Sequence, residues 1–152
     1  MTDIITTLQL LLITLYVTFI YRRYGVLTSI SASTYHLGKV ERSLFYFWLV
    51  GLAGLNLAQG MEIWGIITAI GLCFSGVTLD HAEPYGNADK VHLVGTVAAI
   101  IAAFSGLFFL YGMWIPTVLL LVGIALLYKN KNFIWWIELV AFGLVLGSYY
   151  LR

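Results

Sequence analysis

Charged residues are scarce in this sequence of 152 residues, of which 10% are charged and 61% are hydrophobic. Roughly a quarter of the residues in an ordinary soluble domain are charged. A soluble protein of this size has a large surface relative to its volume and needs polar side chains to cover it. Together with a mean hydropathy of +0.94, this shortage excludes an ordinary soluble domain and favours a membrane protein.

Cysteine and clustered basic residues are also lacking. The single cysteine, Cys73, has no partner in the chain, which excludes a disulfide within it and a thiolate metal cage. The net charge is +1, and lysine and arginine are scattered along the sequence. The sequence therefore offers no basic surface for a nucleic acid, and we expect no nucleic acid partner.

Apolar runs between polar residues predict an all-α protein, a polytopic transmembrane helical bundle that forms a single domain over residues 1–152. The six expected spans are 3–21, 43–58, 62–79, 91–111, 114–128 and 133–151. The second can extend back through residues 39–42, and the fifth, where Pro116 suits the first turn, is so short that its full crossing stays open. Polar turn residues separate the spans at Gln59-Gly60, at 83–86 and at 129–132.

The positions of lysine and arginine predict the orientation of the spans. These residues gather in the first, third and fifth loops, and Arg152 alone lies on the other side. The loop residues are Arg22, Arg23, Lys39, Arg42, Lys90, Lys129 and Lys131. Because cytoplasmic loops carry the excess of positive charge, we expect the odd-numbered loops in the cytoplasm and both termini outside it.

Small residues at helical spacing predict close contacts between spans, since helices in a bilayer associate by close packing. The fourth span is richest in them, and we expect it at the centre; its stripes are Gly95, Ala99, Ala103 and Ala98, Ala102, Gly106. Gly143 and Gly147 form a pair in the last span, and such stripes leave a homo-oligomer open. A stripe of hydroxyl side chains in the first span should turn inward toward other helices; it contains Thr7, Thr14, Thr18 and Tyr21.

Aromatic residues lie mostly near the ends of the spans. Tyrosine and tryptophan are enriched at the two membrane interfaces. We interpret the following set as an interfacial belt rather than a ligand cage: Tyr21, Tyr24, Tyr46, Trp48, Trp114, Tyr128, Trp135, Trp136, Tyr149 and Tyr150.

Ionisable residues gather on the predicted cytoplasmic side, where they supply a candidate binding site. Its residues are Ser31, His36, Asp80, His81, His92 and Glu138. Glu138 lies about 8 Å into the last span by helical rise, at a depth where an ionisable side chain needs a partner and marks a functional site. In the structural alternative, Glu138 pairs with Arg22, Arg23 or Lys129, and the histidines are interfacial polar residues.

Metal binding is one chemistry that this set leaves open. A divalent metal takes imidazole and carboxylate ligands, which His36, His81, His92 and Asp80 would supply. Their spacing does not match the HExxH pattern of a helical zinc site. Haem is not expected, because no CxxCH motif is present and His36 and His92 lie at membrane edges.

Two further chemistries involve the first cytoplasmic loop and the last span. A proton relay or pH sensor would use His92 with Glu138. Nucleophilic hydrolysis would use Ser31 or a neighbouring serine near His36, although no GxSxG elbow is present. The first loop, residues 22–42, is long for so small a bundle and mixes hydroxyl with apolar side chains, as a segment packed over the mouth of the bundle would.

The run Ser29-Ile30-Ser31 with Tyr35-His36, followed by Asp80 and the segment 91–96, resembles a pattern in bacterial membrane proteins and in the DRAM-like six-span group. The resemblance covers roughly residues 25–110. It implies a six-helix bundle, in the bacterial inner membrane, whose Ser/Tyr/His loop and Asp/His segment meet at one face. The seven-span metal-dependent lipid hydrolases that include alkaline ceramidases are less similar, because no histidine follows His92 here and one span is missing.

These features favour a small, non-enzymatic integral membrane protein that binds membrane lipids, an ion or a protein partner. Its pocket would lie on the cytoplasmic face, between the first loop, the third loop and the inner end of the last span. One alternative is a metal-dependent membrane lipid hydrolase with His36, His81 and His92 as ligands. The other is a proton-coupled channel or transporter subunit that uses Glu138 and the hydroxyl stripe of the first span.

Overall fold

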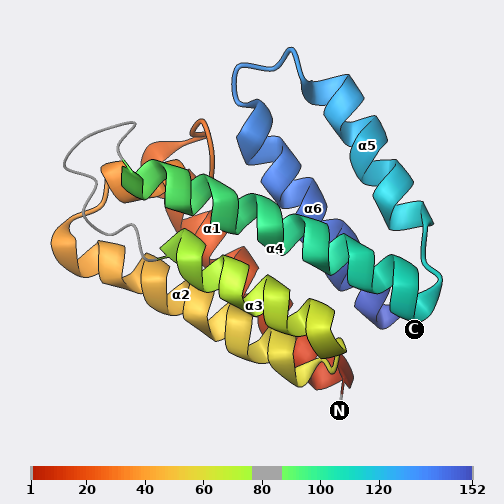
Figure 1. Ribbon diagram of the computed structural model, residues 1–152. Coiled ribbons are helices and arrows are strands. Elements are labelled where there is room, and N and C mark those ends of the chain that lie inside the picture. Colours follow the sequence, from red (N-terminus) through yellow and green to blue (C-terminus); the bar gives the residue numbers. More distant parts are fainter. Residues whose placement is uncertain (1, 77–86, 152) are drawn as a thin grey trace. The chain divides into compact units, whose positions relative to one another are not determined.

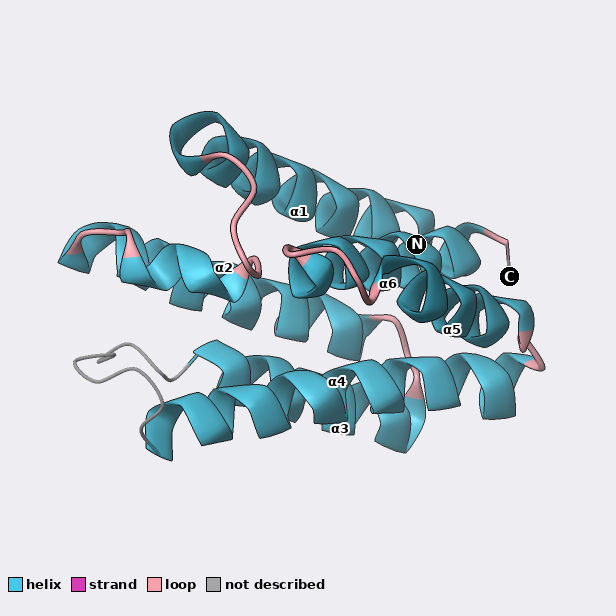
Figure 2. Ribbon diagram, turned by 90° about the horizontal axis from the view of Figure 1, so that it is seen from above, coloured by secondary structure: helices cyan, strands magenta, loops and turns pink. Residues whose placement is uncertain are grey.

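The computed structural model describes residues 2–76 and 87–151, and within these ranges the chain is helical, with no strand (Figures 1 and 2). The α-helices of these ranges are α1 Thr2–Tyr24, α2 Lys39–Ala58, α3 Glu62–Gly76, α4 Asn87–Tyr111, α5 Ile115–Leu127 and α6 Phe133–Tyr150, and a short 3-10 helix, η1 Ser31–Tyr35, lies between α1 and α2. The all-α class is confirmed, and a helix lies in each of the six predicted ranges. The predicted turn at 83–86 and the candidate residues Asp80 and His81 lie outside the described residues.

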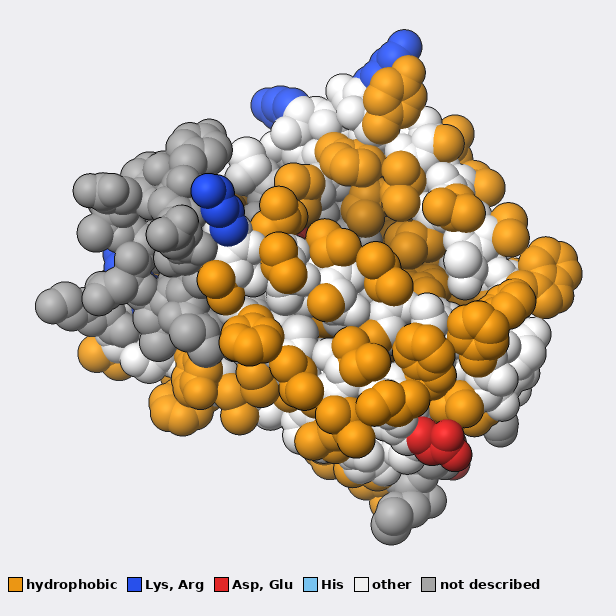
Figure 3. Space-filling view, in the orientation of Figure 1, with side chains coloured by type: hydrophobic (Ala, Val, Ile, Leu, Met, Phe, Trp, Pro, Cys, Tyr) orange, Lys and Arg blue, Asp and Glu red, His pale blue; other side chains and the backbone are white. Residues whose placement is uncertain are grey.

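Three helices are long and apolar enough to cross a membrane, namely the stretches Asp3–Tyr24, Lys90–Tyr111 and Phe133–Tyr150. The described parts of α3 and α5 are apolar but shorter than the roughly 20 residues that a span requires. Hydrophobic side chains also cover most of the described surface on the face shown in Figure 3. Length and composition are thus those of a membrane protein.

The chain divides into two compact units. Unit 1 comprises Met1–His36 and Leu107–Arg152, and unit 2 comprises Leu37–Gly106. Unit 1 therefore holds α1, η1, α5, α6 and the last turn of α4. Unit 2 holds α2, α3 and the rest of α4.

In unit 2, α2 and α3 form a helical hairpin. Helix α2 begins at Lys39, as the sequence allowed, and the Gly38 N–H donates to Glu41 Oε2 (3.0 Å) in its first turn. It ends at Ala58, directly before the predicted Gln59-Gly60 break. The buried Asn56 amide donates to the Gly65 carbonyl of α3 (3.1 Å), which fixes the two helices against each other.

Helices α3 and α4 pack through their glycines. A Cβ on Gly71 would lie 2.6 Å from the Gly95 carbonyl oxygen, and a Cβ on Gly95 would lie 2.7 Å from the Gly71 carbonyl oxygen. Only hydrogen fits at these two positions, and Ala99 is buried one turn further along α4. The predicted small-residue stripe of the fourth span is therefore confirmed as a packing surface, whereas Cβ atoms on Gly143 and Gly147 of α6 would meet nothing within 4 Å.

In unit 1, α6 contacts both α5 and α1, and Figure 1 shows α5 and α6 side by side. Pro116 lies in the first turn of α5, as predicted. Helix α1 ends at Tyr24, directly before Gly25, whose φ of +75° suits glycine, and the Gly25 N–H donates to the Tyr21 carbonyl (2.9 Å). At the opposite end of α1, Thr7 Oγ1 and the Tyr150 hydroxyl lie 2.7 Å apart and tie α1 to α6.

The prediction of an interfacial aromatic belt is wrong for some of its residues. Trp135 and Tyr149 are among the largest fully buried side chains, with 1% and 2% of their surface exposed. Trp114 and Tyr128 are exposed, as residues of a belt would be.

Candidate functional site

The segment from Gly25 to His36, called here the 25–36 segment, is fixed to helix α6 by two hydrogen bonds, one to a side chain and one to the backbone of α6. The Ile30 N–H donates to Glu138 Oε2 at 2.6 Å, and the Trp135 N–H donates to the Thr28 carbonyl at 3.1 Å. Ile30 is 2% exposed, and Glu138 is buried. Glu138 thus has a partner, as its depth required, but this partner is a backbone amide, and the alternative ion pair with Arg22, Arg23 or Lys129 is not formed within the described residues.

A further contact fixes the same segment to helix α1. The hydroxyl of Tyr16 and Oγ of Ser33 lie 2.7 Å apart in a buried hydrogen bond. Ser33 is fully buried and lies in η1. The 25–36 segment is therefore held on α1 and α6 of unit 1. Its predicted position over the mouth of a membrane bundle stays a prediction.

The candidate serines of the segment shape its turn. Ser29 Oγ accepts from the Ala32 N–H (2.9 Å) and lies 2.9 Å from Ser31 Oγ, while Thr34 Oγ1 donates to the Ser31 carbonyl (2.8 Å). Such local hydroxyl bonds are typical of residues that begin short helices and turns. Ser31 therefore has a structural role whatever else it does.

His36 is exposed at the end of the segment, and its ring lies against that of Tyr24 at an interplanar angle of 31°. The two ring centroids lie 5.5 Å apart, and the Tyr24 hydroxyl donates to the His36 carbonyl (3.2 Å). Within the described residues, no serine hydroxyl is hydrogen bonded to the His36 ring. The nucleophile and base that a serine hydrolase requires are thus not paired here.

His92 lies in unit 2 and is oriented by α3. Its Nδ1 lies 2.6 Å from the Ser75 carbonyl oxygen. Since a carbonyl can only accept, Nδ1 carries the proton and donates it. The Ser75 hydroxyl donates to the Gly71 carbonyl (2.9 Å) and lies 2.9 Å from the Thr96 hydroxyl, so His92 belongs to a polar network between α3 and α4.

The described structure brings together only part of the predicted site. Ser31, His36 and Glu138 belong to unit 1, His92 belongs to unit 2, and Asp80 and His81 lie outside the described residues. No group of three His, Cys, Asp or Glu side chains among the residues described is arranged to hold a metal ion. The predicted metal set includes the two candidates outside these residues, so it stays a prediction.

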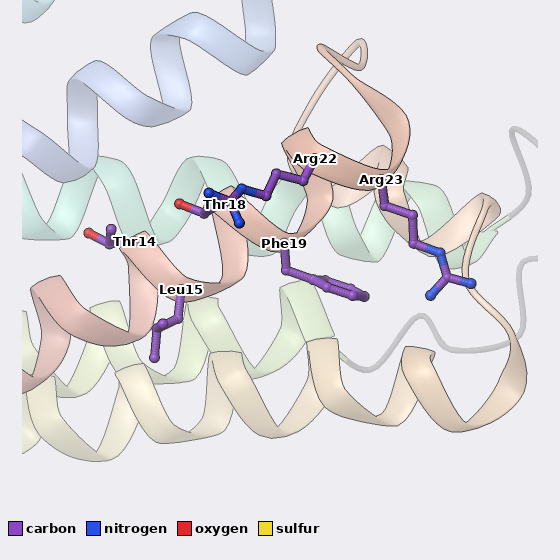
Figure 4. Close-up of a pocket in the computed structure, with 6 residues that line it drawn as sticks. All are labelled: Thr14, Leu15, Thr18, Phe19, Arg22 and Arg23. Carbon is purple, nitrogen blue, oxygen red and sulfur yellow. The ribbon is translucent and has the colours of Figure 1, made fainter.

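An open hollow of about 580 Å³ lies on the outer side of α1, near its C-terminal end (Figure 4). Its lining residues are Thr14, Leu15, Thr18, Phe19, Arg22 and Arg23. The hydroxyl stripe of α1 shares this side, because Thr7, Thr14, Thr18 and Tyr21 are all exposed. The prediction that the stripe turns inward is therefore wrong for Thr14, Thr18 and Tyr21, whereas Thr7 contacts Tyr150 of α6. The buried side of α1 carries Ile13, Tyr16 and Ile20 instead.

Sequence reasoning missed the hollow and the contact between Tyr16 and Ser33. The signal for the hollow was present, since Thr14, Thr18 and Arg22 follow one another at intervals of four and thus share one helical face. A weaker signal for the fixed segment was Ile30, an apolar residue among serines. No comparable signal marks Tyr16 as a hydrogen-bonding residue within its apolar helix.

No family model, curated protein or solved structure matches this chain. The resemblance to the DRAM-like six-span group stays a prediction. The geometry of unit 1 is therefore what carries a functional proposal.

Proposed function

We propose that this chain is a six-span integral membrane protein of the bacterial inner membrane, with both termini outside the cytoplasm. It is not an enzyme, and it binds a lipid, an ion or a protein partner through the cytoplasmic end of unit 1. The 25–36 segment is the contact surface for this partner. The three long apolar helices and the biased positions of lysine and arginine support the membrane assignment.

The hydrogen bond from the Ile30 N–H to Glu138 Oε2 carries the proposal. An ionisable side chain inside a span is costly, and those that persist have a specific task. Here the task is to hold the backbone of a connecting segment against α6, with Tyr16 holding the same segment against α1. Connections that are fixed in this way, rather than left loose, are frequently functional.

The side chains that the segment presents favour binding over hydrolysis. The Ser29 and Ser31 hydroxyls are hydrogen bonded to each other and to the turn, and the Ser33 hydroxyl is buried on Tyr16. What a partner meets at the surface is the exposed Thr28 and His36. An imidazole next to hydroxyls and backbone groups binds anions, cations or peptide groups without needing a reaction.

Cysteine alkylation tests this proposal, because Cys73 is the only native cysteine. In a Cys73→Ala background, Thr28→Cys places a reporter on the segment, and Asn130→Cys places a matched one on the exposed loop before α6. Phosphatidylglycerol, phosphatidylcholine, Mg²⁺, Zn²⁺ and a membrane extract are added in turn, and the rate of maleimide reaction is measured.

We expect one of these additions to slow alkylation at Thr28→Cys, to leave Asn130→Cys unchanged, and to lose its effect when His36→Ala is added. Equal slowing at both reporters would show non-specific coating and contradict the proposal. Unchanged rates at Thr28→Cys with every addition would also contradict it.

A metal-dependent membrane hydrolase is the second candidate, and the orientation of His92 favours it. Histidines that bind metals usually donate their second ring N–H to a carbonyl or carboxylate, and His92 Nδ1 donates to the Ser75 carbonyl. Elemental analysis of the purified protein tests this candidate. Stoichiometric zinc that is lost in a His92→Ala variant would favour the hydrolase, and its absence from the native protein would exclude a zinc enzyme.

A further inference from the structure

We infer that the hollow on the outer side of α1 binds the head group of an anionic phospholipid. The site is separate from the 25–36 segment and uses different residues. It requires that α1 crosses the membrane, for which Asp3–Tyr24 has the necessary length and hydropathy. It requires neither six spans nor a partner for the segment.

The residues of the hollow form two parallel rows on α1. Thr14, Thr18 and Arg22 make one row, at intervals of four residues, and the adjacent row contains Leu15, Phe19 and Arg23. Residues four apart lie one above the other on a helix. In Figure 4 the Arg22 side chain reaches back along the helix toward Thr18. A polar row and an apolar row thus run side by side and both end in an arginine.

The threonines of the polar row differ from four other hydroxyl residues of the helices. Thr7, Thr68, Ser75 and Ser148 each donate to a carbonyl four residues earlier, at 2.6–2.9 Å. That bond is how a hydroxyl is satisfied where water is absent. Thr14 and Thr18 make no side-chain hydrogen bond within the described part of the chain, and both are exposed. Their hydroxyls are therefore available to a molecule outside the protein.

The arginines give the site its charge preference. Arg22 makes no hydrogen bond, ion pair or ring contact with the described residues, and no acidic side chain lines the hollow. The Arg23 guanidinium lies 5.9 Å from the Phe19 ring centroid and 5.4 Å from that of Tyr24, which holds it at the edge of the hollow. Two guanidinium groups in this position match a phosphate with net negative charge.

Depth distinguishes a lipid from a free phosphate. The arginines lie in the last turn of α1, where a span of this length meets the interface, and Thr18 and Thr14 lie about 6 and 12 Å deeper by helical rise. A phospholipid places its phosphate at the interface, its ester carbonyls next below and its acyl chain below these. The phosphate would accept from Arg22 and Arg23, an ester carbonyl would accept from the Thr18 hydroxyl, and the chain would pack along Leu15 and Phe19.

Basic residues in the last turn of a helix also have a purely structural explanation, because they interact favourably with the helix dipole and with the cytoplasmic side of a membrane. That explanation needs the charges of Arg22 and Arg23 but not the threonine hydroxyls. It also predicts that any cytoplasmic lysine is equivalent to Arg22. Variants at Thr18 and Lys129 therefore separate the two explanations.

The test is native mass spectrometry of the purified full chain with stepwise additions of phosphatidylglycerol or phosphatidylcholine. The variants are Arg22→Gln and Thr18→Val, and the matched controls outside the hollow are Lys129→Gln and Thr117→Val. We expect the native chain to prefer phosphatidylglycerol. We expect Arg22→Gln to weaken that binding about fivefold, Thr18→Val to weaken it without a change of charge, and both controls to leave it unchanged.

Equal losses in Lys129→Gln and Arg22→Gln would overturn the inference, as would equal binding of the two lipids by the native chain. Displacement of the lipid by inorganic phosphate at the same concentration would overturn the assignment to a lipid. If Arg22→Gln does not fold, Thr18→Val carries the test, because it keeps the shape and charge of the site. Failure here leaves the alkylation result at Thr28→Cys unaffected, so the two proposals fail separately.

Discussion

The hydrogen bond between Ile30 and Glu138 can be tested by two substitutions of similar size. Glu138→Gln keeps an oxygen that accepts from the Ile30 N–H, whereas Glu138→Met keeps the length and the methylenes but has no such acceptor. Neither variant carries a charge, so the desolvation of the native carboxyl cancels when they are compared with each other. Since Ile30 is 2% exposed, its N–H finds no water in the Met variant. Leaving a buried donor without an acceptor costs about 1–3 kcal/mol, which is the expected difference between the two variants.

Hydrogen exchange measures this difference where it arises. The free energy of local opening sets the exchange rate of a protected amide, so the peptide that covers the 25–36 segment should exchange about 5 to 150 times faster in Glu138→Met than in Glu138→Gln. The peptide from α5, residues 115–127, serves as the internal control and should exchange equally in both. An unfolding titration in mixed micelles, followed by tryptophan fluorescence, should show the same order of stability.

Equal exchange of the 25–36 segment in the two variants would refute the reasoning, because it would mean that Glu138 does not hold the segment through an accepted hydrogen bond. Faster exchange in both variants than in the native chain, without a difference between them, would also refute it. That result would assign the effect to the charge of Glu138 rather than to its oxygen as an acceptor.

Three further experiments have defined expected outcomes. Gly71→Ala should lower the free energy of unfolding by about 1–3 kcal/mol, because its Cβ would lie 2.6 Å from the Gly95 carbonyl oxygen. Gly143→Ala, whose Cβ would meet nothing within 4 Å, should be close to neutral. Equal effects of the two substitutions in an unfolding titration would contradict the glycine contact. Tyr16→Phe should lose the bond to Ser33 and cost about 1–2 kcal/mol, seen as faster exchange of the 25–36 segment; an unchanged rate would show that this bond is dispensable. An impermeant maleimide tests the orientation of the spans. It should label single cysteines in the first and fifth loops only from the cytoplasmic side, and single cysteines in the second and fourth loops only from the other side. Labelling of the fourth and fifth loops from the same side would show that α5 does not cross. Suitable exposed positions in the Cys73→Ala background are Thr28 and Asn130 in the first and fifth loops, and Ala58 and Trp114 beside the second and fourth, since none of the four has a positive φ.

The positions of the helices could be predicted because local chemistry determines them. Helix α2 ends before Gln59-Gly60, and α5 begins with Pro116 in its first turn. The glycine contact between α3 and α4 was also foreseeable, since a backbone approach this close requires small residues on one helical face. These signals lie within a few residues of the feature that they predict.

The inner side of α1 could not be predicted, because its composition does not distinguish one side from the other. Helix α1 has apolar residues all around it, and a bilayer gives no hydrophobic reason to bury one apolar face rather than another. The hydroxyl stripe and the buried row of Ile13, Tyr16 and Ile20 have similar helical spacing. Packing against the other helices buries the row of Ile13, Tyr16 and Ile20 and leaves Thr14 and Thr18 exposed.

The candidate site was predicted in part, for a related reason. Glu138 was identified correctly as a residue that needs a partner, because depth in a span is readable from position alone. Its partner was not readable, since the Ile30 backbone amide carries no sequence signal of its own and lies far from Glu138 along the chain. The sequence shows only charged side chains as possible partners, and the alternative ion pair of Glu138 with Arg22, Arg23 or Lys129 was therefore wrong.

The two proposed surfaces meet at Tyr24. Its ring lies against that of His36 of the 25–36 segment, with centroids 5.5 Å apart, and it also lies 5.4 Å from the Arg23 guanidinium at the edge of the hollow. Tyr16 and Thr18, by contrast, lie on opposite sides of α1, one bonded to Ser33 and the other exposed. The polar groups of this helix therefore divide into an inner set that holds the segment and an outer set that is exposed.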